Sequence, residues 1–192
     1  LLAAGYAPEY RERPLDSEEM AAMRAVVEHV LAGHEPYPAL AVDRHWNMLA
    51  ANASVTILTE QVAPELLVPP ANVLRIALHP DGLAPQIVNY DEWRTHILHR
   101  LTRQIEASAD PVLTTLHEEL AGYDQTANDN ETAPPSDIAV PLIIDTVVGR
   151  VSFVSTVTIF GTPVDVTLSE LAIEAFYPAD RQSAQLLQRL TV

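Results

Sequence analysis

The stretch that decides the fold class is residues 138–159, Ile-Ala-Val-Pro-Leu-Ile-Ile-Asp-Thr-Val-Val-Gly-Arg-Val-Ser-Phe-Val-Ser-Thr-Val-Thr-Ile. Apolar side chains recur at every second position in each of its halves: Ile138, Val140, Leu142 and Ile144, then Val151, Phe153, Val157 and Ile159, with Ser155 interrupting the second series. Alternation of this kind is typical of a strand with one buried face. The residues between the halves, Thr146 to Gly149, can turn the chain. The stretch therefore predicts two antiparallel strands.

Downstream, the pattern predicts one more strand and a helix. The apolar residues of 166–175 change phase at Ser169-Glu170, which indicates a β-bulge at that point. Asp180 can then cap a final helix that carries Leu186, Leu187 and Leu190. Residues 138–192 are thus expected to form a three-strand meander followed by a helix.

Upstream, a helix and a hairpin are expected. Residues 14–33 have apolar side chains at three- and four-residue steps, with Asp16 or Ser17 as the cap and Gly33 as the end of the helix. Two short apolar runs, 39–43 and 46–50, then flank Arg44-His45. Because two residues suffice to join antiparallel strands, we expect a hairpin there.

Helices should fill the segment between hairpin and meander. Asn52 can cap a helix that runs to about Thr59, and Asn72 begins one or two turns that stop before Pro80. The longest helix is expected at residues 90–107, with an apolar stripe of Trp93, Ile97, Leu101 and Ile105. A further helix should begin after Asp110 and run to about Ala121. The polar, acidic residues 124–137 are typical of a surface loop.

This order of elements predicts an α+β fold. The hairpin and the meander would form one five-stranded antiparallel sheet, and the intervening helices would cover one of its faces as a cap. That is a PAS-like arrangement, in which small molecules sit between cap and sheet.

Composition excludes several classes of function. The 192 residues include 26 acidic side chains and 11 basic ones, all of them Arg, for a net charge of −15. Such a surface repels a phosphate backbone, so nucleic-acid binding by this segment is not expected. The absence of Cys excludes disulfides and thiolate chemistry. No stretch has the 18 or more apolar residues of a membrane span, and the start lacks the features of a signal peptide, so we expect a soluble, cytoplasmic domain.

Several stretches together resemble a known family, the MmyB-like ligand-binding domain, which follows an XRE-type helix-turn-helix domain in many bacterial regulators. They are residues 1–8 (Leu-Leu-Ala-Ala-Gly-Tyr-Ala-Pro), 36–47 (Pro-Tyr-Pro-Ala-Leu-Ala-Val-Asp-Arg-His-Trp-Asn) with 50–52, 72–75 with 79–82 (His-Pro-Asp-Gly), and 155–163 with 176–180 (Phe-Tyr-Pro-Ala-Asp). The resemblance covers nearly the whole chain. It implies a PAS-like fold, a regulatory role and an apolar ligand, with fatty acids as the first class to consider.

The resemblance also implies a division of the chain. Residues 1–13 would be the exit from an upstream helix-turn-helix domain, 14–34 a linker and dimerisation helix, and 35–192 the PAS-like ligand-binding domain. A homodimer is expected, because operators with two-fold symmetry are usually read by dimers. DNA would be bound only through the upstream domain.

The residues predicted to line a ligand site come from both sides of the space between cap and sheet. They are Trp46, Leu74, Leu78, Trp93, Ile97, Leu101, Phe153, Ser155, Val157 and Phe176. Arg75 and Arg94 are the basic residues nearest to the cap in sequence, so they are the candidate partners of a ligand carboxylate. Each aromatic residue could equally be a plain core residue, and each arginine could face solvent.

No enzyme, metal or cofactor is predicted. His96 and His99 have a spacing that can hold a metal, but without a third ligand in register they favour a solvated helix face. Asp43, Asp165, Glu170 and Glu174 lie beside a turn or a bulge or in an outward phase, so we expect solvated carboxylates. Two alternatives stay open: a PAS-like dimerisation module with a filled interior, and a small-molecule isomerase or hydrolase. A pocket would argue against the first, and a buried carboxylate facing it would favour the second.

Overall fold

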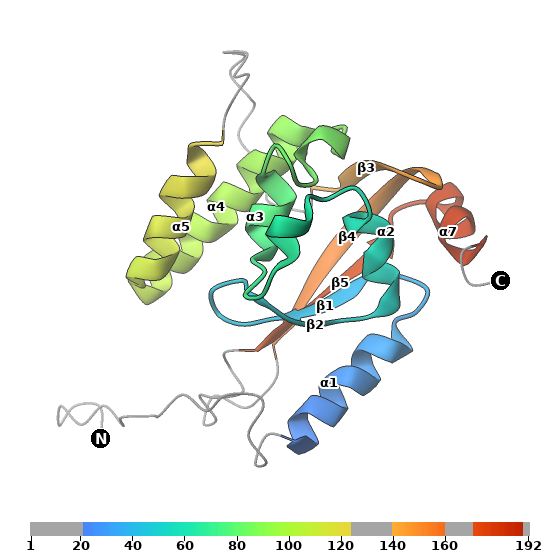
Figure 1. Ribbon diagram of the computed structural model, residues 1–192, viewed down its shortest axis with the longest axis horizontal. Helices are drawn as coiled ribbons and strands as arrows, with labels where there is room; N and C mark the ends of the chain where they lie inside the picture. The colour runs from blue at the N-terminus through green and yellow to red at the C-terminus, as the bar shows by residue number, and fades with distance from the viewer. Residues whose placement is uncertain (1–20, 124–139, 160–170, 190–192) are drawn as a thin grey trace.

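A single antiparallel sheet of five strands organises the chain (Figure 1). The computed structural model describes residues 21–123, 140–159 and 171–189. The strands are β1 (Ala39–Val42), β2 (Met48–Ala51), β3 (Leu142–Thr146), β4 (Gly149–Ile159) and β5 (Ala172–Pro178). Their order in the sheet is β2-β1-β5-β4-β3, so the hairpin is joined to the meander through β1 and β5. The predicted fold class is confirmed.

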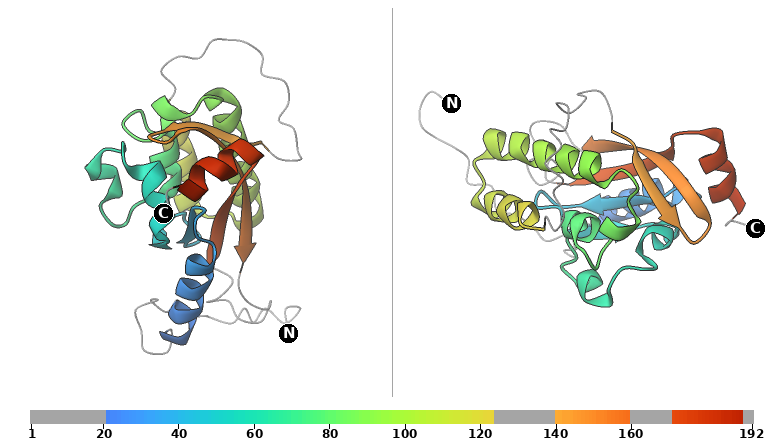
Figure 2. Two further views of the ribbon diagram at one scale, coloured as in Figure 1. Left: turned by 90° about the vertical axis from the view of Figure 1, so that its right-hand side faces the viewer. Right: turned by 90° about the horizontal axis from the view of Figure 1, so that it is seen from above.

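The helices lie on both sides of the sheet. They are α1 (Ala21–Gly33), η3 (Ala53–Val55), α2 (Thr56–Thr59), η4 (Pro64–Leu67), α3 (Val73–Leu78), η5 (Ala84–Gln86), α4 (Tyr90–Ser108), α5 (Pro111–Ala121) and α7 (Arg181–Gln188). Figures 1 and 2 show α1 on one side and α3, α4 and α5 on the other. No helix in the described parts of the chain is both long and apolar enough to cross a membrane.

The cap helices α3 and α5 begin at the residues that the sequence predicts. Asn72 accepts hydrogen bonds from the backbone N–H groups of Leu74 and Arg75 and so caps α3. Asp110 accepts one from Val112 and caps α5. The stripe on α4 is buried at Trp93, Ile97 and Leu101, and Ile105 packs against the same core. These helices pack on the sheet face that carries Leu40, Val42 and Phe176.

The opposite sheet face is also buried, because α1 covers it. Val27 and Leu31 of α1 pack against Ala41, Ile173 and Ala175. Residues of β5 therefore alternate between two buried environments rather than between core and solvent. A charged residue in the middle of this strand, from Ile173 to Phe176, is therefore buried on either face.

The predicted hairpin is confirmed, but its turn is longer than two residues. The chain reverses over residues 43–47, with Trp46 at a φ of 67°. The carboxylate of Asp43 accepts hydrogen bonds from the backbone N–H groups of His45 and Asn47, at 2.8 and 2.9 Å, and from the Asn47 amide. The Asp43 side chain thus stabilises a turn that contains no glycine.

Asn52 has a different role from the predicted one. Its side chain makes no bond to the helical turn that follows it. Instead its Oδ1 accepts from the Ala39 N–H at 3.0 Å, and its Nδ2 donates to the carbonyls of Leu31 and Tyr37 at 3.2 and 2.8 Å. The buried amide therefore ties the end of α1 to the start of β1.

Replacing Asn52 with Ala should lower the free energy of unfolding by about 2–3 kcal/mol, because three buried backbone groups lose their partner. The measurement is the urea midpoint of the purified chain. Asn52→Asp is the matched comparison, since it keeps the acceptor and removes the donors; it should fall below wild type as well. An Asn52→Ala variant as stable as wild type would contradict the role of this amide.

Several predictions lie outside the described residues. They include the helix-turn-helix exit at residues 1–13, the Asp16 or Ser17 cap of the first helix, the surface loop at 124–137, and the bulge at Ser169-Glu170 with the carboxylates of Asp165 and Glu170. Within the described part, the final helix is confirmed: Asp180 accepts from the backbone N–H of Ser183 and caps α7.

Candidate functional site

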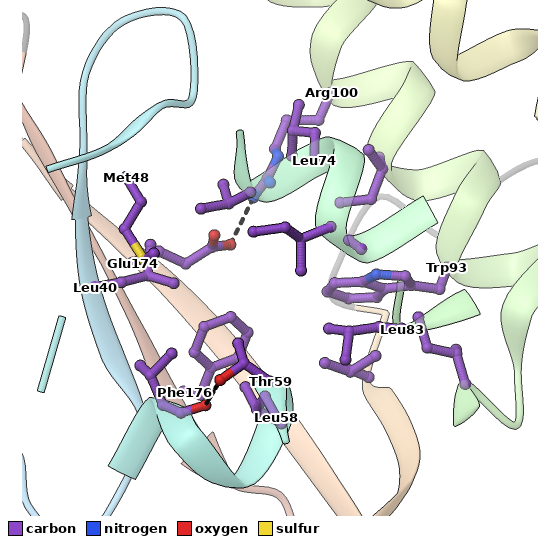
Figure 3. Close-up of a pocket in the computed structure, with 17 residues that line it drawn as sticks. Leu40, Met48, Leu58, Thr59, Leu74, Leu83, Trp93, Arg100, Glu174 and Phe176 are labelled. Atoms are coloured by element: carbon purple, nitrogen blue, oxygen red, sulfur yellow. Dashed lines mark hydrogen bonds and ion pairs between the residues drawn. The ribbon is translucent and has the colours of Figure 1, made fainter. Parts of the chain in front are cut away.

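A cavity lies between the cap and the sheet (Figure 3). The space open to the centre of a water-sized sphere is about 60 Å³. Most of its wall is apolar, with contributions from the sheet, α2, α3 and α4: Leu40, Met48, Val55, Leu58, Val73, Leu74, Ile76, Ala77, Leu83, Ile87, Trp93, Ile97, Leu142 and Phe176. The polar residues of the wall are Thr59, Arg100 and Glu174.

Arg100 of α4 and Glu174 of β5 form an ion pair in this wall. The Arg100 Nη1 donates to Glu174 Oε1 at 3.0 Å, and the two side chains are 18% and 5% exposed. Figure 3 shows both side chains extending into the space between helix and sheet. Charges removed from water in this way are tolerated only when they are paired, so each residue depends on the other.

Trp46 holds Arg100 in place, and Gln104 in turn holds Trp46. The Arg100 Cζ lies 4.3 Å from the centre of the Trp46 ring, a cation–π contact. The Trp46 Nε1 donates to Gln104 Oε1 at 2.8 Å, and Gln104 Nε2 donates to the Arg44 carbonyl at 2.9 Å. The long hairpin turn, with its left-handed Trp46, therefore positions the cation of the cavity.

Two buried N–H donors on cavity-lining residues have no hydrogen-bond partner among the described residues: Arg100 Nη2 and Trp93 Nε1. Buried polar groups are nearly always hydrogen-bonded, so such donors need an explanation. One explanation is that a bound molecule supplies the hydrogen-bond acceptor. A third unpartnered donor, Arg94 Nε, belongs to a residue outside the cavity wall.

His96 lies on α4, as Trp93 and Arg100 do, and its ring stacks on that of Trp93, with ring centres 5.6 Å apart. Burial, and then the positive charge of Arg100, lower the pKa of His96 below its ordinary value. The imidazole is therefore neutral at pH 7. His99 is exposed, and no three His, Asp or Glu side chains in the described residues are grouped so that they could hold a metal.

The residues predicted for the ligand site divide into three groups. Leu74, Trp93, Ile97 and Phe176 line the cavity. Trp46, Leu78, Leu101 and Phe153 are buried in the surrounding core without lining it. Ser155 and Val157 share the cap face of β4 with Phe153, but Ser155 is only partly buried and Val157 is 42% exposed.

Neither arginine predicted as a carboxylate partner lines the cavity. Arg75 pairs with Glu119 on α5, with its Nε and Nη2 at 2.7 and 2.8 Å from the two carboxylate oxygens. The hydrogen bond from Arg75 holds the pKa of Glu119 below its ordinary value, and burial with the hydrogen bond to Glu119 raises the pKa of Tyr123 to about 12. Arg94 donates from Nη2 to the Ala121 carbonyl at 2.8 Å. Both arginines tie cap helices together.

The expectation that Glu174 is solvated was wrong. It assumed that Leu171, Ile173 and Ala175 mark the only buried phase of the strand, whereas α1 covers that phase and the cap covers the other. The stripe predicted for α4 likewise leaves out Arg100, which lines the cavity. The spacing of Trp93, Ile97 and Arg100, four and then three residues, could have indicated a shared face.

A comparison with models of protein families identifies a family that spans most of the chain. Residues 23–190 match the family described as MmyB-like transcription regulator ligand binding domain. The match spans the sheet, the cap and α7. A comparison with curated protein sequences finds no significant match.

Proposed function

Since this chain belongs to the family of MmyB-like transcription regulator ligand binding domains, we propose that it senses an apolar small molecule, with a hydrocarbon chain like that of a fatty acid, bound between cap and sheet. The observation that carries the proposal is the cavity itself, which has an almost wholly apolar wall and two unpartnered donors. Such a combination suits a ligand with a hydrocarbon body and one polar end.

Binding such a molecule requires the cavity to widen. Its volume of about 60 Å³ is well below the roughly 300–1,000 Å³ of typical ligand pockets. The wall at α2 is the natural place to open, because α2 is a single turn and Thr59 lines both the cavity and an outer groove with Pro36, Ser54 and Ile57. A ligand that displaces α2 would reshape the surface next to the end of α1.

The expected affinity depends on the length of the ligand's alkyl chain. Each methylene moved from water into the cavity contributes about 0.8 kcal/mol, so ten of them contribute about 8 kcal/mol. Ordering the ligand and opening the cap consume part of this. Micromolar binding is the result we expect for a medium-length alkyl chain.

An enzyme is the less favoured reading, although Glu174 is the buried carboxylate that it would need. A general base must be free to take a proton from a bound substrate. Glu174 is instead held by the cation of Arg100 at 3.0 Å. The matched family is a regulatory ligand-binding domain rather than an enzyme family.

In this proposal the ligand shifts the chain between two arrangements, and a separate DNA-binding domain of the regulator responds. The net charge of −15 favours placing the DNA contact outside this chain. We propose a cytoplasmic homodimer, for which α1 is the candidate contact: Val26 is 46% exposed and Val30 is 42% exposed, on a strip of the helix that flanks the buried Val27 and Leu31.

The test is binding of 1-decanol to the delipidated chain, measured by calorimetry and by the rise in melting temperature. Leu74→Phe places a larger side chain in the cavity wall and should weaken binding at least roughly tenfold, because it removes the space for about two methylenes. Leu116→Phe, the same change in the buried side of α5 outside the wall, is the matched control and should bind as wild type does. Equal binding by both variants would place the ligand elsewhere.

A further inference from the structure

The charges in the cavity wall select the polar end of the ligand. Arg100 and Glu174 both line the cavity, and they neutralise each other in direct contact. We infer, building on the proposed function, that the ligand has an uncharged polar end, such as an alcohol, ester or amide, and that a free carboxylate is disfavoured.

The first step in the argument is the charge balance. A ligand carboxylate beside Arg100 would also lie beside Glu174, whose side chain is 5% exposed. Two carboxylates that share one buried cation leave an uncompensated negative charge, and repulsion at such distances is large where water is scarce. A neutral acceptor brings no such charge into the cavity.

The second step is what the unpartnered donors need. Arg100 Nη2 and Trp93 Nε1 each need an acceptor. The Trp93 side chain belongs to a residue that is 3% exposed, so solvent outside the protein does not satisfy it. A carbonyl or hydroxyl oxygen on an alkyl chain accepts a hydrogen bond from a donor of this kind without being ionised.

The third step is that the positive charge in the wall is already engaged. Besides Glu174, Arg100 is in contact with the face of Trp46 at 4.3 Å. The neighbouring titratable group on the same helix, His96, has a lowered pKa and adds no positive charge at neutral pH. In the described residues, the wall itself therefore contributes one cation and one anion.

The experiment compares 1-decanol, decanoate and decylammonium on the delipidated chain at pH 7.5, by calorimetry. The alcohol should bind at least roughly tenfold more tightly than either ion. Glu174→Gln removes the anion and keeps an acceptor for Arg100, so in this variant decanoate should bind more tightly than the alcohol. Asp145→Asn, which removes the carboxylate of the exposed Arg150 pair on β3 and β4, is the matched control and should keep the preference of wild type.

A second measurement does not depend on a variant folding. Lowering the pH from 7.5 to 5 converts part of the decanoate to the neutral acid, so its binding to wild type should strengthen while that of 1-decanol stays the same. Decanoate binding wild type as tightly as the alcohol would overturn the inference and leave the proposed function standing. Failure of all three compounds to bind would overturn both.

Discussion

Replacing Arg100 with Met is expected to lower the free energy of unfolding by about 3–5 kcal/mol, the cost of leaving a buried charge without its partner. The stranded group is Glu174, which is 5% exposed and has its Oε1 3.0 Å from Arg100 in the wild type. The Met side chain fills much of the same volume but offers neither a positive charge nor a donor. The measurement is the urea midpoint at pH 7.5.

The double variant Arg100→Met/Glu174→Leu separates the charge from the packing. Because neither charge remains, it should regain most of the lost stability. Arg150→Met, which breaks the exposed pair with Asp145, should hardly change the midpoint, since water solvates the carboxylate that remains. A double variant as unstable as Arg100→Met alone would show that packing of Arg100, rather than its charge, stabilises the cap.

Replacing Gly82 with Ala should destabilise the cap by about 3 kcal/mol. An added Cβ would lie 2.2 Å from the carbonyl oxygen of Ile76, so backbone atoms must move apart, and overpacking of this kind typically costs about 1–3 kcal/mol or more. The same turn is fixed by the N–H of Leu83, which donates to the Ile76 carbonyl at 2.8 Å. Because Ile76 and Leu83 both line the cavity, the variant should also bind 1-decanol more weakly.

Gly33→Ala is the matched control for this prediction. No atom lies within 4 Å of the added Cβ at Gly33, so the variant should be as stable as wild type or slightly more stable. Melting curves of both variants check the pair. If the Gly82→Ala variant had the melting temperature of wild type, the turn after α3 would be able to relax around the added Cβ. The cavity wall would then not depend on the close packing of this turn.

The sequence predicts the elements of this fold well because each depends on local signals. The strand β4, the apolar stripe of α4 and the caps at Asp110 and Asp180 are all read from neighbouring residues, and the structure bears them out. The predicted buried face of β4 is confirmed only at Val151 and Phe153, since Val157 and Ile159 are exposed. The hairpin turn and Asn52 differ from the prediction because their partners are tertiary: the Asn52 amide bonds to residues 21 and 15 positions away.

The site is harder to predict than the fold, for a related reason. Four of the ten predicted residues line the cavity, since an apolar stripe and a buried strand identify a face but not the part of it that is left unfilled. The ion pair joins residues 74 positions apart. Glu174 is buried because the cap covers its phase of β5, while α1 covers the other phase. A charged residue in a strand that is apolar on both phases is the signal that could have indicated it.

The most direct test of a ligand-binding cavity is native mass spectrometry of the chain with excess 1-decanol, alongside its Leu74→Phe variant. The account predicts one added molecule per wild-type chain and a much smaller bound fraction for the variant. The bare mass of the wild-type chain at every alcohol concentration, with an unchanged melting temperature, would contradict it and would favour a filled module that binds no ligand.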